Sequence, residues 1–181
     1  MEQNDYAKRC INILLMRYPD RFSKLFRLVS RSDYNHASIG ISDTDGIFYS
    51  YGLKGFRKET PKDHPKFKEK EVPCCLYRIE VSEDIYGIAK SILHEHEKDA
   101  INFKFTYFGV ALCILKIGYK RKERYFCSQF VSEVLDQLKA VPLEKQSSLY
   151  LPDDFMKIQE LNLSFKGYLS ELFRLQLPLA Q

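Results

Sequence analysis

The sequence predicts an α+β fold, because two kinds of segment alternate along its 181 residues. Three short apolar runs have the composition of β-strands: 11–16, 34–41 and 74–81. Three longer segments place apolar residues three or four positions apart, as an amphipathic helix does: 20–30, 83–98 and 126–138. Strands and helices mixed in this way along one chain are typical of a sheet that packs against helices.

The N-terminal segment predicts a buried strand followed by a helix. Residues 11–16, Ile-Asn-Ile-Leu-Leu-Met, form a short apolar run that fits a strand in the core. The helix expected over 20–30 has Asp20 at its start, where a carboxylate can accept hydrogen bonds from the first turn. The apolar residues at helical spacing are Phe22, Leu25, Phe26 and Val29.

A β-hairpin is predicted next. Ala37, Ile39 and Ile41 alternate with smaller or polar residues in the first strand, and 47–53 forms the returning strand. Between the two strands, Asp43-Thr44-Asp45-Gly46 is a strong turn signal. We therefore expect these strands to be neighbours in the sheet.

Residues 54–71 differ in composition from the segments on either side. They hold seven basic and four acidic residues, two prolines and almost no aliphatic side chain. This composition predicts a basic surface insertion in the domain. A solvated loop is a simpler explanation of such a charge run than a binding patch.

The second half of the chain predicts mainly helices. The helix at 83–98 is expected to face inward with Ile85, Ile88, Ala89 and Ile92, and the apolar segment 107–117 fits either a strand or a helix. The clearest amphipathic pattern is at 126–138, where one face carries Phe126, Phe130, Val131, Val134, Leu135 and Leu138. A short helix is expected to begin at 151–155, and the Leu- and Phe-rich tail at 162–179 is expected to pack back onto the domain.

Length and composition exclude several classes of protein. A chain of this length forms one domain, and a net charge of +4 is too small to imply a nucleic-acid partner. The longest nearly uncharged apolar stretch, 107–115, is far shorter than the roughly 20 residues of a membrane-spanning helix. The acidic start is unlike a secretory signal, and an odd number of cysteines, five, favours reduced thiols. We therefore expect a single cytoplasmic domain over 1–181 with no transmembrane segment.

His36 and Cys127 are the strongest candidates for chemistry. His36 is a titratable residue near the start of an otherwise apolar strand. Cys127 lies in the opening turn of the helix at 126–138, where the positive end of the helix dipole favours a thiolate. A thiolate paired with an imidazole is the arrangement that nucleophilic catalysis needs. The alternative is a buried cysteine that packs as a small hydrophobic residue.

Two other groups of potential metal ligands are weaker candidates. His94 and His96 could bind a metal on a strand, but on a helix residues two apart point about 200° away from each other. The helical pattern at 83–98 therefore favours a solvated charged face. Cys74 and Cys75 would point to opposite sides of a strand, which favours core packing over a shared metal or a disulfide.

The basic stretch 119–124 is flanked by Tyr119 and Tyr125, and such a mixture of aromatic and basic residues can bind single-stranded nucleic acid. One short run in a chain of low net charge is a weak signal. We therefore expect no nucleic-acid partner.

Two short runs resemble the catalytic motifs of a known family. They are Tyr34-Asn35-His36-Ala37-Ser38-Ile39 and Tyr125-Phe126-Cys127-Ser128-Gln129-Phe130-Val131, and they resemble those of the permuted papain-like enzymes. This circularly permuted branch of the NlpC-type cysteine peptidase superfamily includes the YiiX-type amidases and, more distantly, the lecithin:retinol acyltransferase group. In ordinary papain-like enzymes the cysteine helix precedes the histidine strand, whereas here the histidine strand comes first, as in the permuted branch. The resemblance extends to 49–52 and 151–155, so it covers residues 10–158.

The resemblance implies a fold in which the nucleophile helix packs against an antiparallel, barrel-like sheet. It implies Cys127 as the nucleophile and His36 as the general base and acid. A third polar residue orients the histidine in such enzymes, and Ser50 is the match in this sequence, although a hydroxyl supplies no charge to an imidazolium. The oxyanion would bind to the backbone N–H of Cys127, with the Tyr34 hydroxyl as a further donor.

By this resemblance we expect a cysteine hydrolase, an amidase or peptidase that cleaves an amide or ester bond through a thioester on Cys127. The expected substrate is a small molecule, peptide or lipid that carries such a bond, and no cofactor or metal is expected. One alternative is an acyltransferase or lipid hydrolase of the same fold. The other is a non-enzymatic binding module on an inactive scaffold, which the missing charge on the third residue would favour.

Overall fold

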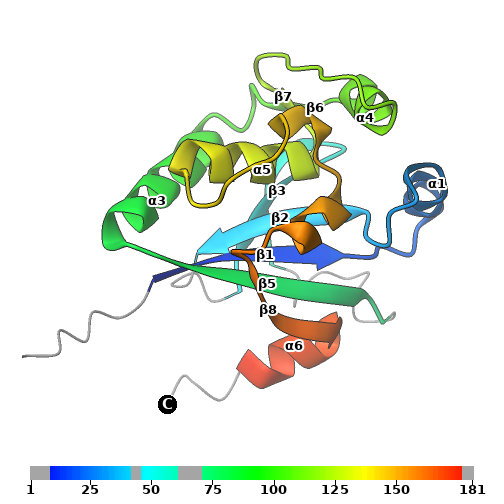
Figure 1. The fold of residues 1–181 in the computed structure, drawn as a ribbon. Helices are drawn as coiled ribbons and strands as arrows, with labels where there is room; N and C mark the ends of the chain where they lie inside the picture. The colour runs from blue at the N-terminus through cyan, green and yellow to red at the C-terminus, as the bar shows by residue number, and fades with distance from the viewer. Residues whose placement is uncertain (1–8, 42–45, 61–70, 177–181) are drawn as a thin grey trace, which may run out of the picture.

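A six-stranded antiparallel sheet forms the centre of the molecule (Figure 1). The computed structural model describes residues 9–41, 46–60 and 71–176. The order of the strands is β4-β3-β2-β1-β5-β8, so β4 and β8 form the two edges. Their bounds are β1 (Arg9–Met16), β2 (His36–Ile41), β3 (Phe48–Gly52), β4 (Gly55–Glu59), β5 (Pro73–Val81) and β8 (Asn162–Tyr168). A separate parallel pair joins β6 (Lys104–Phe105) to β7 (Arg124–Tyr125).

Helices cover both faces of the sheet, and the fold is therefore α+β, as the sequence predicts. In Figure 1, α3 (Glu83–Lys98) and α5 (Cys127–Leu138) lie on one face, and α6 (Leu169–Gln176) lies on the other. Two further helices, α1 (Arg21–Ser30) and α4 (Tyr107–Ile114), lie at one end of the sheet. Short 3₁₀ helices follow α5 at η2 (Ser147–Leu149) and η3 (Pro152–Lys157).

The core is divided between the two faces of the sheet because alternate side chains of a strand point to opposite sides. On the face of α3 and α5, Ala37 and Ile39 of β2 join the larger cluster. On the opposite face, Leu14 and Met16 of β1 pack with residues of β5 and with Leu169 of α6. The central strands β1 and β2 are thus buried on both sides, which explains the continuous apolar run 13–16 in β1 and the small residues between the apolar ones in β2.

Several elements agree with the sequence prediction. The hairpin β2–β3 forms, and α1 begins as expected, with the Ser23 N–H donating to Asp20 over 3.0 Å. The segment 107–117, which fitted a strand or a helix, forms α4. In α5 and at its N-cap, all six apolar residues of the predicted inner face are buried. The tail packs back as β8 and α6.

The prediction of a surface insertion at 54–71 is wrong in its first part. Residues 55–59 form β4, which pairs along its whole length with β3, and 61–70 lie outside the described residues. The turn between the two strands needs Gly55, which has φ +102° and a Cβ position that Phe103 O would meet at 2.5 Å. Because β4 is an edge strand, it tolerates three consecutive charged residues, 57–59, and lacks the apolar pattern of the central strands.

The inner face of α3 also differs from the prediction. Tyr86, Ala89 and Leu93 are the buried residues of this helix, whereas Ile88 is half exposed. Ala89 is buried as predicted, and Ile85 and Ile92 are partly buried against the core. The inner face is centred on Tyr86 and Leu93, which the prediction did not include. Within the described residues, every helix is too short or too polar to cross a membrane.

Candidate active site

His36 lies at the start of β2 and faces a carboxylate from the edge of the sheet. It pairs with Met16 at the end of β1, so it sits where two buried central strands meet the end of the sheet. Its Nε2 atom is 2.8 Å from Oε1 and 3.1 Å from Oε2 of Glu59, in β4. The two side chains are only 5% and 8% exposed. Since Nε2 is engaged by Glu59, Nδ1 is the nitrogen left for another partner.

Glu59 is held in its ionised form by two cationic neighbours. Arg57, two residues earlier on the same face of β4, donates from Nε to Glu59 Oε1 over 2.6 Å. Burial alone would raise the pKa of Glu59, but the charges of His36 and Arg57 and their hydrogen bonds lower it below its usual value. The carboxylate therefore carries a full negative charge beside the imidazole at neutral pH.

Cys127 is the first residue of α5, and its sulfur is hydrogen-bonded to His36. The backbone N–H groups of Ala37 and Ser128 also donate to this sulfur. Burial would raise the pKa of the thiol, but His36 and these two donors lower it below its ordinary value. The N-cap, Phe126, contributes no side-chain hydrogen bond, so the positive end of the helix is left to the cysteine and its surroundings.

The same contacts act on His36 in the opposite direction. Burial would lower the pKa of the ring, but the carboxylate of Glu59 and the hydrogen bond to Cys127 raise it to about 9. A raised histidine pKa and a lowered cysteine pKa both favour the thiolate–imidazolium form of the pair. This is the reactive form of a cysteine nucleophile.

The other cysteines lack this environment. Of the five, Cys127 alone is partly exposed, and the remaining four are buried. Burial raises the pKa of Cys74 and of Cys113 to about 12, which keeps both as thiols. Cys74 packs in the core, as the sequence predicted for the Cys74–Cys75 pair. Cys127 therefore differs from the other cysteines in its partial exposure and in the polar groups around its thiol.

Tyr18 covers the imidazole and completes the surroundings of the pair. Its ring stacks on that of His36 with centroids 4.9 Å apart and planes inclined by 26°. Asn35 fixes its backbone from both sides: the Tyr18 N–H donates to Asn35 Oδ1, and Asn35 Nδ2 donates to the Tyr18 carbonyl. The Tyr18 hydroxyl is hydrogen-bonded to Arg57. Tyr18 thus links the imidazole to the same guanidinium that holds Glu59.

Two of the four predicted site residues lie elsewhere. The Ser50 hydroxyl donates to the Ala37 carbonyl over 2.6 Å and is fully buried, so the residue that orients His36 is Glu59 and not Ser50. Tyr34 precedes β2, and its hydroxyl lies 2.8 Å from the sulfur of Cys75 inside the core. That position leaves Tyr34 as a packing residue and removes it as an oxyanion donor.

Sequence reasoning missed Glu59, Arg57 and Tyr18. The signal for β4 was present, because Gly52 and Gly55 bracket two residues, a spacing typical of a tight hairpin. Once β4 is recognised as the strand next to β3, its only carboxylate is Glu59. Tyr18 carries no comparable signal, since it lies between β1 and α1 in a segment without periodicity.

The other histidine highlighted by the sequence is in an apolar environment. His96 does not belong to a solvated face, because its ring stacks on Phe103 at 4.4 Å and its Nδ1 is 2.9 Å from the Tyr51 hydroxyl. Burial lowers its pKa to about 4, so the ring is neutral. In the described part of the chain, no group of three or more His, Cys, Asp or Glu side chains is arranged to hold a metal ion.

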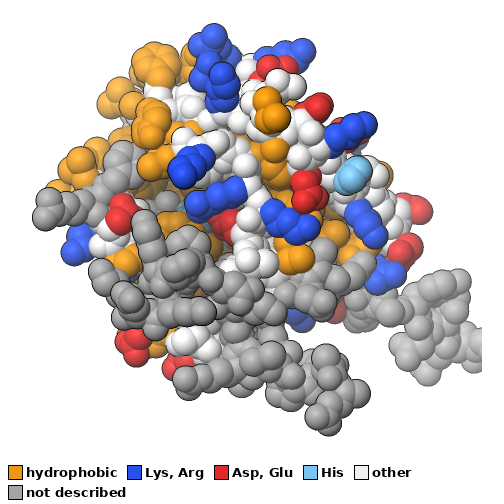
Figure 2. Space-filling view, turned by 180° about the vertical axis from the view of Figure 1, so that it is seen from behind, with side chains coloured by type: hydrophobic (Ala, Val, Ile, Leu, Met, Phe, Trp, Pro, Cys, Tyr) orange, Lys and Arg blue, Asp and Glu red, His pale blue; other side chains and the backbone are white. Residues whose placement is uncertain are grey.

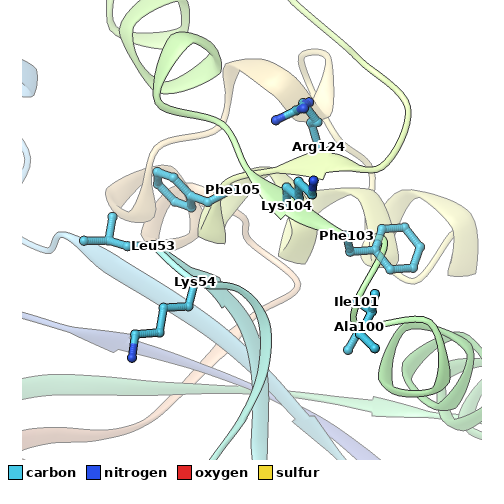
Figure 3. Close-up of a pocket in the computed structure, with 8 residues that line it drawn as sticks. All are labelled: Leu53, Lys54, Ala100, Ile101, Phe103, Lys104, Phe105 and Arg124. Carbon is cyan, nitrogen blue, oxygen red and sulfur yellow. The ribbon is translucent and has the colours of Figure 1, made fainter.

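A shallow pocket of about 540 Å³ lies beside the turn between β3 and β4 (Figure 3). Its walls are Leu53, Lys54, Ala100, Ile101, Phe103, Lys104, Phe105 and Arg124. Neither Cys127, His36 nor Glu59 lines it, so this pocket is separate from the Cys–His pair. The pocket residue Arg124 precedes Cys127 by three residues, so the two sites are close in the sequence.

Comparison with known proteins gives no family for this chain. A scan against protein-family models finds no match, and a search of curated proteins finds no significant relative.

Proposed function

We propose that this protein is a cysteine hydrolase that cleaves an amide or ester bond, with Cys127 as nucleophile and His36 as general base and acid. We further propose that its fold is that of the circularly permuted papain-like enzymes. The histidine strand precedes the cysteine helix in the chain, and α5 packs against β2 and β3 of an antiparallel sheet, which supports this fold.

The observation that carries the proposal is the continuous line of contacts from Cys127 through His36 to Glu59. Each residue comes from a different element, namely α5, β2 and β4, so local sequence does not force them together. A buried carboxylate and imidazole are costly to desolvate, and such groups are retained chiefly where a site uses them. Cys127 is the one cysteine that is not fully buried, which supports access of a substrate to this residue.

The reaction would proceed in two stages. In the first, the Cys127 thiolate attacks the carbonyl carbon, a C–S bond forms, and the carbonyl electron pair moves to oxygen. The oxyanion lies at the start of α5, where the Cys127 N–H and the helix dipole stabilise it. As the tetrahedral intermediate collapses, the C–N or C–O bond breaks and His36 gives its proton to the leaving group.

The second stage releases the acyl group. Neutral His36 takes a proton from water, which attacks the thioester, and the C–S bond breaks to regenerate the thiolate–imidazolium pair. Glu59 is a positioning residue in this scheme. It holds the ring by Nε2, so that Nδ1 faces the sulfur, and it stabilises the imidazolium in both stages.

The geometry bears differently on the two alternatives, the inactive scaffold and the acyltransferase or lipid hydrolase. An inactive scaffold was favoured by the lack of a charged partner for His36 in the sequence motif, whereas Glu59 supplies such a partner and so supports an enzyme. An acyltransferase or lipid hydrolase would share every step as far as the thioester. These activities differ only in which acceptor or acyl group enters the site.

Trapping of the acyl-enzyme tests the proposal. The protein would be mixed with p-nitrophenyl esters of short and long acyl chains, and with the matching anilides, while nitrophenol or nitroaniline release and intact mass are followed. We expect an initial burst and an acyl adduct on Cys127 that Cys127→Ser lacks. Cys113→Ser is the matched control and is expected to behave as the parent. Absence of any Cys127 adduct with every acyl donor would contradict the proposal.

A further inference from the structure

Helix α1 turns an apolar stripe toward solvent. Leu25, Leu28 and Val29 are spaced so that they share one face of this helix, and all three are exposed, with Leu28 at 77%. A surface helix normally directs such a stripe to the core. Figure 1 shows why α1 does not: it stands away from the sheet at the end of the molecule.

Helix α4 and the residues after it expose a second apolar set. Phe108 is 61% exposed and Leu115 is 66% exposed, and Tyr107 and Ile117 are also exposed. Phe108 and Leu115 are seven residues apart, so they lie on the same side of the helix and its C-terminal extension. Isolated exposed apolar residues are ordinary, but two helical stripes of them are not.

The two sets lie at the end of the molecule that carries Cys127 and His36. Helix α1 connects Met16 at the end of β1 to His36 at the start of β2, which places it at that end of the sheet. Figure 1 shows α4 on the same side as α1. Seen from behind, hydrophobic side chains gather over both helices along one edge of the molecule (Figure 2). We call the exposed residues of α1 and of 107–117 the end face.

Positive charge concentrates in the two chain segments that bear the end face. Segment 20–33 has four cations and two acids, and segment 104–124 has six cations and one acid. The chain as a whole has a net charge of only +4, so the remainder is negative. Lys24 is exposed on α1, and the Lys122 side chain is 93% exposed in the loop after α4. A partner must therefore offer both apolar and anionic groups.

We propose that the end face docks onto a lipid bilayer that contains anionic lipids. Interfacial helices place an apolar face in the acyl boundary and cations among the headgroups. The exposed side chains of α1 and α4 project from separate convex helices, which suits insertion into a lipid surface. The cations add attraction to anionic headgroups. Docking in this way would bring the Cys127 end of the molecule to the bilayer without any segment that spans it.

Vesicle co-sedimentation tests the docking. The full chain would be mixed with vesicles of phosphatidylcholine alone or with phosphatidylserine, at low and high salt. We expect binding to the phosphatidylserine vesicles that falls with salt, because each cation near an anionic surface contributes about fivefold in affinity. Lys24→Glu with Lys122→Glu should reduce this binding at least about tenfold, because both charges reverse sign. Leu28→Ser with Phe108→Ser should reduce it by a similar factor, because both side chains would otherwise enter the lipid.

The matched control is Ile88→Ser with Leu163→Ser, two residues that are about as exposed but lie outside the end face. This variant should bind as the parent, and circular dichroism would verify that every variant is folded. Cys127→Ala should also bind as the parent, so loss of catalysis and loss of docking are distinguishable. Absence of binding to phosphatidylserine vesicles would overturn the proposal, as would undiminished binding of the Leu28→Ser and Phe108→Ser variant. Formation of a dimer in place of vesicle binding would indicate a protein partner instead.

Discussion

The two histidines His36 and His96 show how differently this fold treats the same side chain. Both rings are packed against aromatic residues, His36 under Tyr18 and His96 on Phe103. Yet the pKa of His36 is raised to about 9, whereas burial lowers the pKa of His96 to about 4. Desolvation opposes the charged form at both sites. The difference therefore comes from the Glu59 carboxylate and the Cys127 thiol, which His36 has as neighbours.

This comparison distinguishes a histidine with charged neighbours, His36, from a histidine in an aromatic cluster, His96. His96 contacts Tyr51, Phe56, Tyr125 and Phe130 in addition to Phe103, and these rings supply no charge. A neutral imidazole there contributes packing. At His36, the Glu59 carboxylate and Cys127 surround the imidazole, and this arrangement raises the pKa of His36 and lowers the pKa of Cys127.

Removal of the imidazole at the first site should have the largest effect. In His36→Gln the thiol loses its proton acceptor and the leaving group loses its acid, so ester turnover should fall by about 10²–10⁴-fold. Stopped-flow measurement of nitrophenol release would show it. His96→Gln is the matched substitution at the other site and should retain turnover within a few-fold. Equal losses in the two variants would show that the comparison has no catalytic meaning.

Neutralisation of the carboxylate should have a smaller effect. Glu59→Gln keeps a hydrogen-bonding partner for His36 but removes the charge that raises its pKa, so turnover should fall by about 10–100-fold. The pKa of His36, followed by NMR of the ring protons, should move down from about 9. Glu97→Gln, which removes a carboxylate that pairs with Lys58 near the other histidine, is the control. An unchanged His36 titration in Glu59→Gln would contradict the role given to Glu59.

The contributions of the two histidines to the free energy of unfolding should depend on pH in opposite directions. The pKa of His36 is raised, so its contribution is present below its ordinary 6.5 and is lost as pH rises toward 9. The pKa of His96 is lowered, so its contribution is present above 6.5 and is lost as pH falls toward 4. Each change should amount to about 3 kcal/mol in the free energy of unfolding.

Urea unfolding over this pH range would measure both changes. In a Cys127→Ala background the thiol does not titrate, and the part of the His36 change that Glu59 causes should remain. The destabilisation caused by His36→Gln should shrink as the pH rises. His96→Phe should instead remove part of the loss of stability in acid. Parallel pH curves for the two substitutions would contradict the assigned protonation states.

The smallest effect is expected at Ser50. Its hydroxyl donates to the Ala37 carbonyl and has no role at His36, so Ser50→Ala should cost about 1 kcal/mol of stability and leave turnover within about twofold. Thermal unfolding and ester hydrolysis would measure the two quantities. A loss of turnover as large as that of Glu59→Gln would return Ser50 to the site.

The sequence predicted the elements that bear Cys127 and His36 because both elements have strong local patterns. The α5 pattern of six apolar residues and the alternation along β2 depend on neighbours within one turn or one strand. The same locality explains why Asp20 was identified as a cap. These features depend on the spacing of residues close together in the chain, which can be read from a single sequence.

The residues that tune the site could not be found in this way. Glu59 reaches His36 because β4 follows β3 through a glycine turn at the edge of the sheet, a contact between residues 23 positions apart. Likewise, the residues of α3 that face inward depend on which side chains fill the core beneath the helix. The spacing of apolar residues within α3 does not determine this. Long-range packing, and not local propensity, determines both the position of Glu59 and the inner face of α3.

The most direct test of the central claim is the rate of Cys127 alkylation by iodoacetamide as a function of pH. Mass spectrometry would follow all five cysteines in the parent, in His36→Ala and in Glu59→Gln. The account predicts that Cys127 reacts fastest, with a midpoint well below the roughly 8.5 of a free thiol. The midpoint should rise in both variants, more in His36→Ala. A midpoint at the value of a free thiol, unchanged in both variants, would contradict the thiolate–imidazolium pair.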